Sequence, residues 1–175
     1  MSVLPPETAI AITSHTTPLG KGAYGNVIRA TQLKNHRSII IKQFEEKIYF
    51  DSFDLYNNLL IEAYLSYFID PQYTPHLLSY CLKKNQLFFV DSNAISLSQL
   101  LHTHTINDPI VLHQMMHDVC IAVDCLHKLD IIHGDIKADI LLFIHDRANP
   151  ARAYRIKLID YGLALVNGMC LNKKT

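Results

Sequence analysis

The sequence lacks the features that mark a membrane or secreted protein. It contains no run of about 18 apolar residues, the length that a membrane-spanning helix needs. Residues 1–12 include Pro5 and Pro6 and no basic stretch, so a secretory signal peptide is not expected. No internal repeat or low-complexity tract appears. We therefore expect a cytoplasmic location and leave a nuclear one open.

The sequence also has little that would bind nucleic acid or zinc. Sixteen Lys and Arg residues are balanced by sixteen Asp and Glu residues, so no basic excess favours nucleic acid or an anionic membrane as a partner. The cysteines form no C-x-x-C pair and lack a histidine at zinc-ligand spacing; they are Cys81, Cys120, Cys125 and Cys170. We expect them to be small, reduced, apolar residues.

Apolar residues, by contrast, make up 49% of the 175 residues, enough for a hydrophobic core in a chain of single-domain length. Alternating or β-branched segments predict strands within residues 17–31, 38–42, 77–81 and 87–90. Helical spacing of apolar residues predicts helices at 54–69, 96–102 and 109–128. A further hairpin is predicted from residues 140–144 and 155–159.

This order of elements predicts an α+β fold, in which a small antiparallel sheet with one helix precedes a mainly helical part. We expect residues 1–14 to form a loose leader. Residues 15–92 should form the sheet unit and residues 93–175 the helical unit, with a hinge between residues 91 and 96.

Two groups of residues in the first half are candidates for binding phosphate. Residues 20–27, GKGAYGNV, fit the pattern G-x-G-x-x-G-x-V, in which glycines let a strand-turn-strand backbone approach a phosphate. Lys42 ends a predicted strand, and Glu62 lies on the predicted helix that follows. Alone, the glycines suit an ordinary hairpin and Lys42 a solvated strand end. Glu45 and Glu46 are alternative partners for Lys42, but they follow it too closely to come from a returning helix.

Two motifs in the second half carry aspartates. Residues 133–137, HGDIK, fit H-x-D-x-K, and residues 160–162, DYG, fit D-F-G with Tyr161 in place of Phe. Each aspartate also has a purely structural interpretation, because Asp135 can cap a turn and Asp160 can end a strand before a glycine turn. The order and spacing of all four motifs are hard to produce by chance.

Together the motifs resemble those of eukaryotic-type protein kinases of the Ser/Thr class, across residues 16–166. The resemblance implies a two-lobe kinase-like fold that transfers the γ-phosphate of ATP to a protein hydroxyl, with ATP and Mg as cofactors. It implies that Asp135 accepts the hydroxyl proton, Lys137 neutralises charge on the phosphoryl group and Asp160 holds Mg. The nucleotide-binding residues that it implies are Gly20, Gly22, Gly25, Val27, Lys42, Glu62 and Leu142.

The chain departs from this family at several positions. Ile140 stands where the family has the Asn that ligates a second Mg, which leaves Asp139 as the alternative ligand. We expect the lost ligand to slow turnover by at least the about 10–100-fold that second-shell changes cost. Ile40 replaces a small Ala that packs against adenine and is expected to narrow the nucleotide slot. Gly134 replaces the Arg that grips a phosphorylated activation loop.

Residues 163–175 follow the DYG motif without the A-P-E motif or the later helices of the family. The resemblance therefore implies a truncated helical lobe. Two interpretations stay open. One is a Ser/Thr kinase that acts on a protein substrate. The other is a truncated pseudokinase that binds or inhibits an intact kinase or another partner, as a hetero- or homodimer through its uncovered helical face. A fragment without an independent fold is a third.

Overall fold

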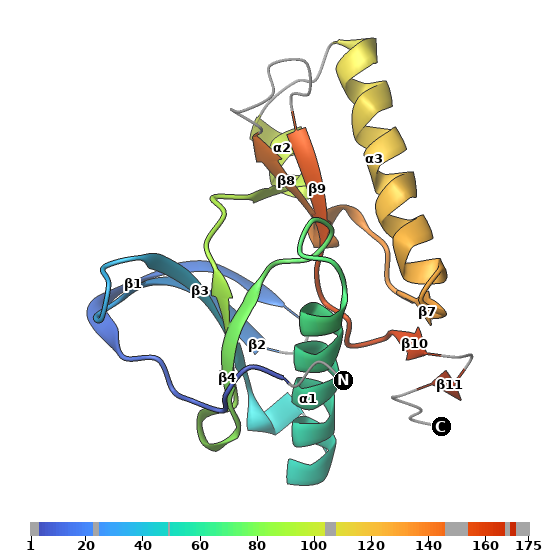
Figure 1. Cartoon of the computed structure of the whole chain (residues 1–175). Coiled ribbons are helices and arrows are strands. Elements are labelled where there is room, and N and C mark those ends of the chain that lie inside the picture. Colours follow the sequence, from blue (N-terminus) through green and yellow to red (C-terminus); the bar gives the residue numbers. More distant parts are fainter. Residues whose placement is uncertain are drawn as a thin grey trace. The chain divides into compact units, whose positions relative to one another are not determined.

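The computed structural model describes residues 4–22, 25–48, 50–103, 108–145, 154–166 and 169–170, so residues 23–24 of the glycine motif lie outside the described part. The chain forms two compact units (Figure 1). The first ends at Phe68 and resumes over His76–Asp91, and the second contains Ile69–Pro75 and continues from Ser92.

The first unit is built on a five-stranded antiparallel sheet with the order β1-β2-β3-β5-β4. The strands are β1 (Ile12–Gly22), β2 (Gly25–Gln32), β3 (Ser38–Phe44), β4 (Leu77–Cys81) and β5 (Gln86–Val90). The 3-10 turn η1 (Glu46–Ile48) follows β3, and η2 (Leu82–Lys84) joins β4 to β5. Asn85 closes that connection in the left-handed conformation, with φ of 53°, which asparagine tolerates well.

One helix, α1 (Ser52–Phe68), lies against this sheet (Figure 1). Strand β3 alternates between the two faces of the sheet, as a period of two requires. Phe44 joins the buried cluster that α1 completes, together with Leu55, Leu59, Ala63, Leu77, Leu87 and Phe89. Ile39 and Ile41 belong instead to a second buried cluster, with Ala30, Cys81 and Phe88. The predicted antiparallel sheet with one helix is confirmed.

The segment expected to be a loose leader is paired with the sheet. Strand β1 already begins at Ile12, and the amide of Thr8 donates to the carbonyl of Tyr80 over 2.9 Å. The carboxylate of Glu7 accepts from the amide of Leu82 over 3.2 Å. Strand β4 is an edge strand whose outer backbone groups need partners, and this segment supplies them.

Among its described residues, the second unit contains two α-helices and two small sheets. The helices are α2 (Leu97–Thr103) and α3 (Pro109–His127), and η3 (Ala138–Ile140) is a 3-10 turn. One sheet has the order β6-β8-β9, from β6 (Ile95–Ser96), β8 (Leu141–His145) and β9 (Tyr154–Leu158). The other has the order β7-β10-β11, from β7 (Ile131–Ile132), β10 (Leu165–Val166) and β11 (Met169–Cys170). The predicted hairpin is therefore present as β8 and β9.

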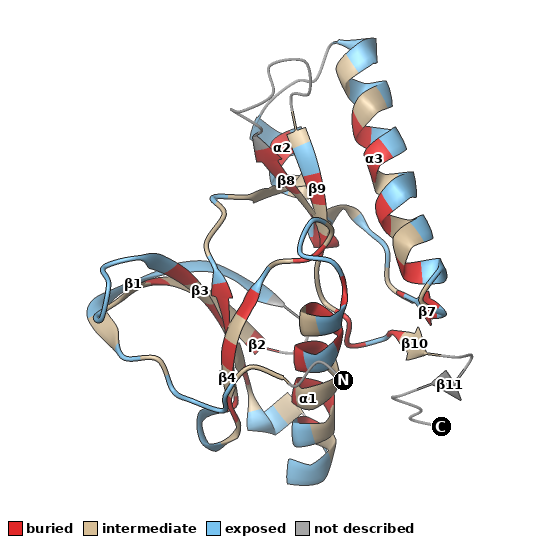
Figure 2. Ribbon diagram, in the orientation of Figure 1, coloured by how far each residue is buried: buried red, intermediate tan, exposed pale blue. Residues whose placement is uncertain are grey.

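Helix α3 begins where the sequence predicts it and packs against β9. Asp108 caps it by accepting from the amide of Ile110 over 2.8 Å, and Pro109 occupies the first turn. Figure 2 shows its buried residues on one side of the helix, and they are Met115, Asp118, Ala122 and Leu126. Leu112, predicted on the apolar stripe, is 44% exposed.

Residues 69–75, expected in the sheet unit, group with the second unit because they are hydrogen-bonded to β9. The Lys157 ammonium on β9 donates to the carbonyl of Pro71 over 2.6 Å and to that of Thr74 over 3.0 Å. The amide of Leu158 donates to the carbonyl of Tyr73 over 2.7 Å. These bonds fix the loop to β9, although it follows α1 in the chain.

Over the described ranges, no helix combines the length and apolar character that crossing a membrane demands.

Candidate active site

One group of candidate residues, in the first unit, is an ion pair between β3 and α1. The Lys42 ammonium lies 2.7 Å from Oε1 and 2.6 Å from Oε2 of Glu62, so it donates to both carboxylate oxygens. The side chain of Glu62 is 4% exposed and that of Lys42 is 13% exposed. Charges this deeply buried are retained when they are paired and hydrogen-bonded. The structure thus brings together the two residues that the sequence predicts as partners.

The alternative carboxylates have other partners. Glu45 accepts from the amide of the Asn26 side chain over 2.6 Å and lies 3.0 Å from the Lys47 ammonium. The hydrogen bond from Lys47 is the main reason that the pKa of Glu45 lies below its usual range. Glu46 accepts from the Asn85 side chain over 3.0 Å. Neither therefore competes with Glu62 in this structure.

The glycine motif occupies the β1–β2 hairpin beside Lys42. Gly22 pairs with Gly25 at the end of the hairpin, and Val27 stands opposite Lys42 in the β2–β3 register. A Cβ on Gly25 would lie closer than 3.0 Å to the backbone carbonyl of Gln43, which leaves room only for glycine. A Cβ on Gly20 would meet no described atom within 4 Å. The two glycines thus differ, because Gly25 is required by packing and Gly20 borders open space.

A second group of candidate residues lies in the second unit, in the loop between β7 and η3. The Lys137 ammonium lies 2.5 Å from Oδ2 of Asp135. This hydrogen bond is the main reason that the pKa of Lys137 is raised, and the charges of Asp160 and Asp139 raise it further. The charges of three carboxylates in this unit therefore favour the protonated form of one ammonium group.

His133 joins this loop to the turn that carries Asp160. Its Nε2 donates to the carbonyl of Ile159 over 3.0 Å, since a carbonyl can only accept, and its Nδ1 accepts from the amide of Asp135 over 3.4 Å. The side chain is 1% exposed, and burial lowers its pKa below the usual range. The neutral ring also packs against Tyr161, with centroids 5.2 Å apart. Both residues lie inside the predicted motifs, but the motifs alone predict no role for either of them.

The metal side of the site is less complete than the family pattern. Asp160 is half-buried, and its backbone has φ of 67°, a left-handed conformation that Asp adopts more readily than most residues. Ile140 is 2% exposed, whereas its neighbour Asp139 is exposed. Within the described part of the chain, no group of three His, Cys, Asp or Glu side chains converges to hold a metal ion alone.

These residues fit a nucleotide better than they fit two metal ions. Lys42 presents an ammonium group that is held by Glu62, and Gly20 borders open space. Mg is commonly held by one or two carboxylates together with phosphate oxygens, so Asp160 suits one ion. The buried apolar Ile140 offers no ligand atom to a second ion.

Leu142, which the sequence predicts to pack against adenine, is half-buried on β8 opposite Lys157. Ile40 packs partly against the α1-side cluster.

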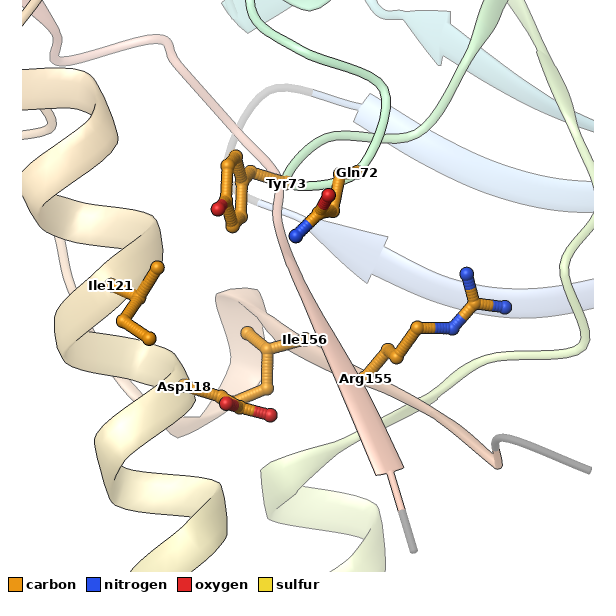
Figure 3. Close-up of a pocket in the computed structure, with 6 residues that line it drawn as sticks. All are labelled: Gln72, Tyr73, Asp118, Ile121, Arg155 and Ile156. Carbon is orange, nitrogen blue, oxygen red and sulfur yellow. The ribbon is translucent and has the colours of Figure 1, made fainter. Parts of the chain in front are cut away.

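A separate cavity in the second unit is no candidate for the nucleotide. It has a volume of about 20 Å³ and is lined by Gln72, Tyr73, Asp118, Ile121, Arg155 and Ile156 (Figure 3). Such a volume has room for about one water molecule. Asp118, 8% exposed on α3, is a buried polar residue that the apolar pattern of the helix concealed.

Comparison with known proteins gives a family match over most of the chain. The profile of the protein kinase domain matches residues 14–170. MAP kinase-activated protein kinase 2 of Drosophila melanogaster is 43% identical over 51 residues, which are 29% of this chain and 13% of that protein. The serine/threonine-protein kinase greatwall of Xenopus tropicalis is 25% identical over 171 residues, 93% of this chain and 18% of that protein.

A similar match is the probable serine/threonine-protein kinase zyg-1 of Caenorhabditis elegans, which is 24% identical over 163 residues. The match covers 89% of this chain and 21% of that protein. The chain thus spans about a fifth or less of the length of these curated relatives.

Proposed function

Because this chain belongs to the protein kinase domain family, we propose that it is a Ser/Thr kinase unit that transfers the γ-phosphate of ATP to a protein hydroxyl. The observation that best supports this proposal is the buried Lys42–Glu62 ion pair. A buried ammonium–carboxylate pair contributes little net stability because of its desolvation cost, and this family uses the pair to orient ATP phosphates.

The proposed nucleotide-binding residues are those that the sequence indicates. Lys42 would contact the α- and β-phosphates, Glu62 would orient Lys42, and Val27 and Leu142 would pack against the adenine ring. Gly20, Gly22 and Gly25 would let the β1–β2 hairpin approach the phosphates. Bound ATP would supply the transferred phosphoryl group and the phosphate oxygens that complete a Mg site.

The proposed catalytic residues lie in the loop after β7. Asp135 would accept the proton of the attacking hydroxyl at its carboxylate, and Lys137 would neutralise charge that develops on the transferred group. The 2.5 Å contact between them keeps the Lys137 ammonium charged and close to the reacting atoms. Asp160 would hold Mg, with Asp139 as the second carboxylate.

A phosphate-transfer assay tests this proposal. The purified chain is incubated with radiolabelled ATP, Mg and casein as a generic protein substrate. We expect slow transfer that Asp135→Asn and Asp160→Ala each abolish. Asp130→Asn is the matched control, because Asp130 is exposed outside the site and holds φ of 55°, which Asn tolerates. Transfer that survives Asp160→Ala would contradict the proposal.

The alternative is a pseudokinase that binds a partner without turnover, and the burial of Ile140 favours it. An apolar residue at a metal-ligand position removes charge stabilisation from the transition state. In this case a folded wild-type chain would show no transfer, yet it would form a stable complex with an intact kinase or another protein. For either function, the proposed partners are proteins, and the proposed location is cytoplasmic or nuclear.

A further inference from the structure

Gly134, which stands where the family has an arginine, lies in close contact with the backbone of Leu163. Its backbone has φ of 81°, in the region that glycine occupies without strain. A Cβ on Gly134 would lie closer than 3.0 Å to the carbonyl oxygen of Leu163 and 3.5 Å from the Leu163 Cβ. The chain after the DYG turn therefore touches the loop that carries Asp135 at a point where only glycine fits.

Other contacts hold the same two segments together. Leu165 pairs with Ile132 and Val166 pairs with Ile131, in the antiparallel contact between β7 and β10. The amide of Ala164 donates to the carbonyl of Tyr161 over 3.0 Å, and both of these residues are buried. The segment that follows Asp160 is thus fixed by backbone contacts, strand pairing and burial.

We propose that Gly134 is a positioning residue, whose missing side chain lets the Leu163 carbonyl close against the catalytic loop and so fixes the turn of Asp160 beside Asp135. The catalytic consequence rests on the function proposed above.

Hydrogen exchange of the ATP-free protein tests the contact itself. Gly134→Ala and Gly134→Asn both add a Cβ, but Asn tolerates the left-handed backbone that strains Ala. We expect both variants to exchange the amides of residues 163–166 at least tenfold faster than wild type, while those of β8 and β9 are unchanged. Leu163→Ala is the matched control, because it keeps every atom that meets Gly134, and it should behave as wild type.

A second measurement on the same variants is the gain in ATP affinity that Mg provides, which general loosening of the fold would not change selectively. Gly134→Asn should reduce by about tenfold the gain in ATP affinity that Mg provides, and leave the affinity without Mg unchanged. Thermal unfolding of each variant checks that it is folded.

Three results would overturn the inference. These are Gly134→Asn that exchanges like wild type, Leu163→Ala that loosens the segment equally, and wild-type amides of residues 165 and 166 that exchange as freely as an unstructured peptide. The last needs no variant and stands even if the substitutions prevent folding. Failure of wild type to bind ATP would instead contradict the proposed function, because the exchange pattern is measured without ATP.

Discussion

The imidazole of His133 donates from Nε2 to the carbonyl of Ile159 and accepts at Nδ1 from the amide of Asp135. One neutral ring thereby links the proposed catalytic loop to the residue before Asp160. A protonated ring would lose the acceptor at Nδ1, because both ring nitrogens would then donate. The link therefore depends on the charge state of His133.

Stability should fall in mild acid because of this histidine. Burial lowers the pKa of His133 in the folded state, so the unfolded chain binds a proton at a higher pH than the folded chain does. The contribution is fully present well above about pH 6.5, where the unfolded imidazole is neutral, and is lost as the pH falls through that value. Urea unfolding between pH 8 and pH 5 measures it. His133→Gln should flatten the curve, and an unchanged slope would refute this role.

Breaking the Lys42–Glu62 pair from one side should destabilise the first unit. Lys42→Met leaves a buried carboxylate without its cation, and removal of one partner of a buried pair costs about 3–5 kcal/mol. Lys42→Met with Glu62→Leu should recover most of that loss, since no buried charge remains. Urea unfolding of the two single variants and the double variant gives the coupling energy. Additive effects would mean that the pair is not energetically coupled.

Two glycines of the same hairpin should respond differently to alanine. Gly25→Ala places a Cβ against the Gln43 carbonyl and should cost at least about 1–3 kcal/mol, the scale of local backbone strain. Gly20→Ala meets open space and should change stability by no more than about 0.5 kcal/mol. Gly20→Ala should nevertheless weaken ATP binding if the hairpin covers the phosphates. Equal stability losses in thermal unfolding would contradict the assignment of these positions.

Restoring the residue of the family at position 140 should harm the fold. Ile140 is 2% exposed, so Ile140→Asn buries an amide in an apolar site and loses packing, at a cost of about 2–5 kcal/mol. Asp139→Asn is the matched control, because Asp139 is exposed and its change should fall within about 0.5 kcal/mol. Chemical unfolding compares the two. A stable Ile140→Asn protein would show that the site accepts the amide of the family.

Local pattern was sufficient for most of the elements. The helical spacing of Leu55, Leu59 and Ala63 predicted α1 and placed Glu62 on a helix that returns to Lys42, because a 3.6-residue period fixes which residues share a face. Strand β3 likewise followed from a β-branched run, and the β8–β9 hairpin followed from two runs that flank a polar connection in the sequence.

Contacts between segments far apart in the chain could not be predicted from local sequence patterns. Residues 7 and 8 bind the edge strand β4 and the turn after it, more than sixty residues away. Lys157 binds the loop of residues 69–75, which the sequence had placed in the first unit. Asp118 is polar yet buried on an apolar stripe. In the sequence, Gly134 indicates only the loss of an arginine, whereas in the structure the Leu163 carbonyl lies against it. Each depends on a partner that sequence spacing does not indicate.

The most direct measurement is ATP binding by calorimetry on the purified chain, with and without Mg, for wild type, Lys42→Ala and Lys47→Ala. Lys47 is the matched control, a lysine whose side chain is 75% exposed and pairs with Glu45. The kinase account predicts that wild type and Lys47→Ala bind ATP more tightly with Mg, and that Lys42→Ala binds at least tenfold more weakly. A folded wild-type chain that binds no ATP, or a Lys42→Ala chain that binds as well as wild type, would contradict it.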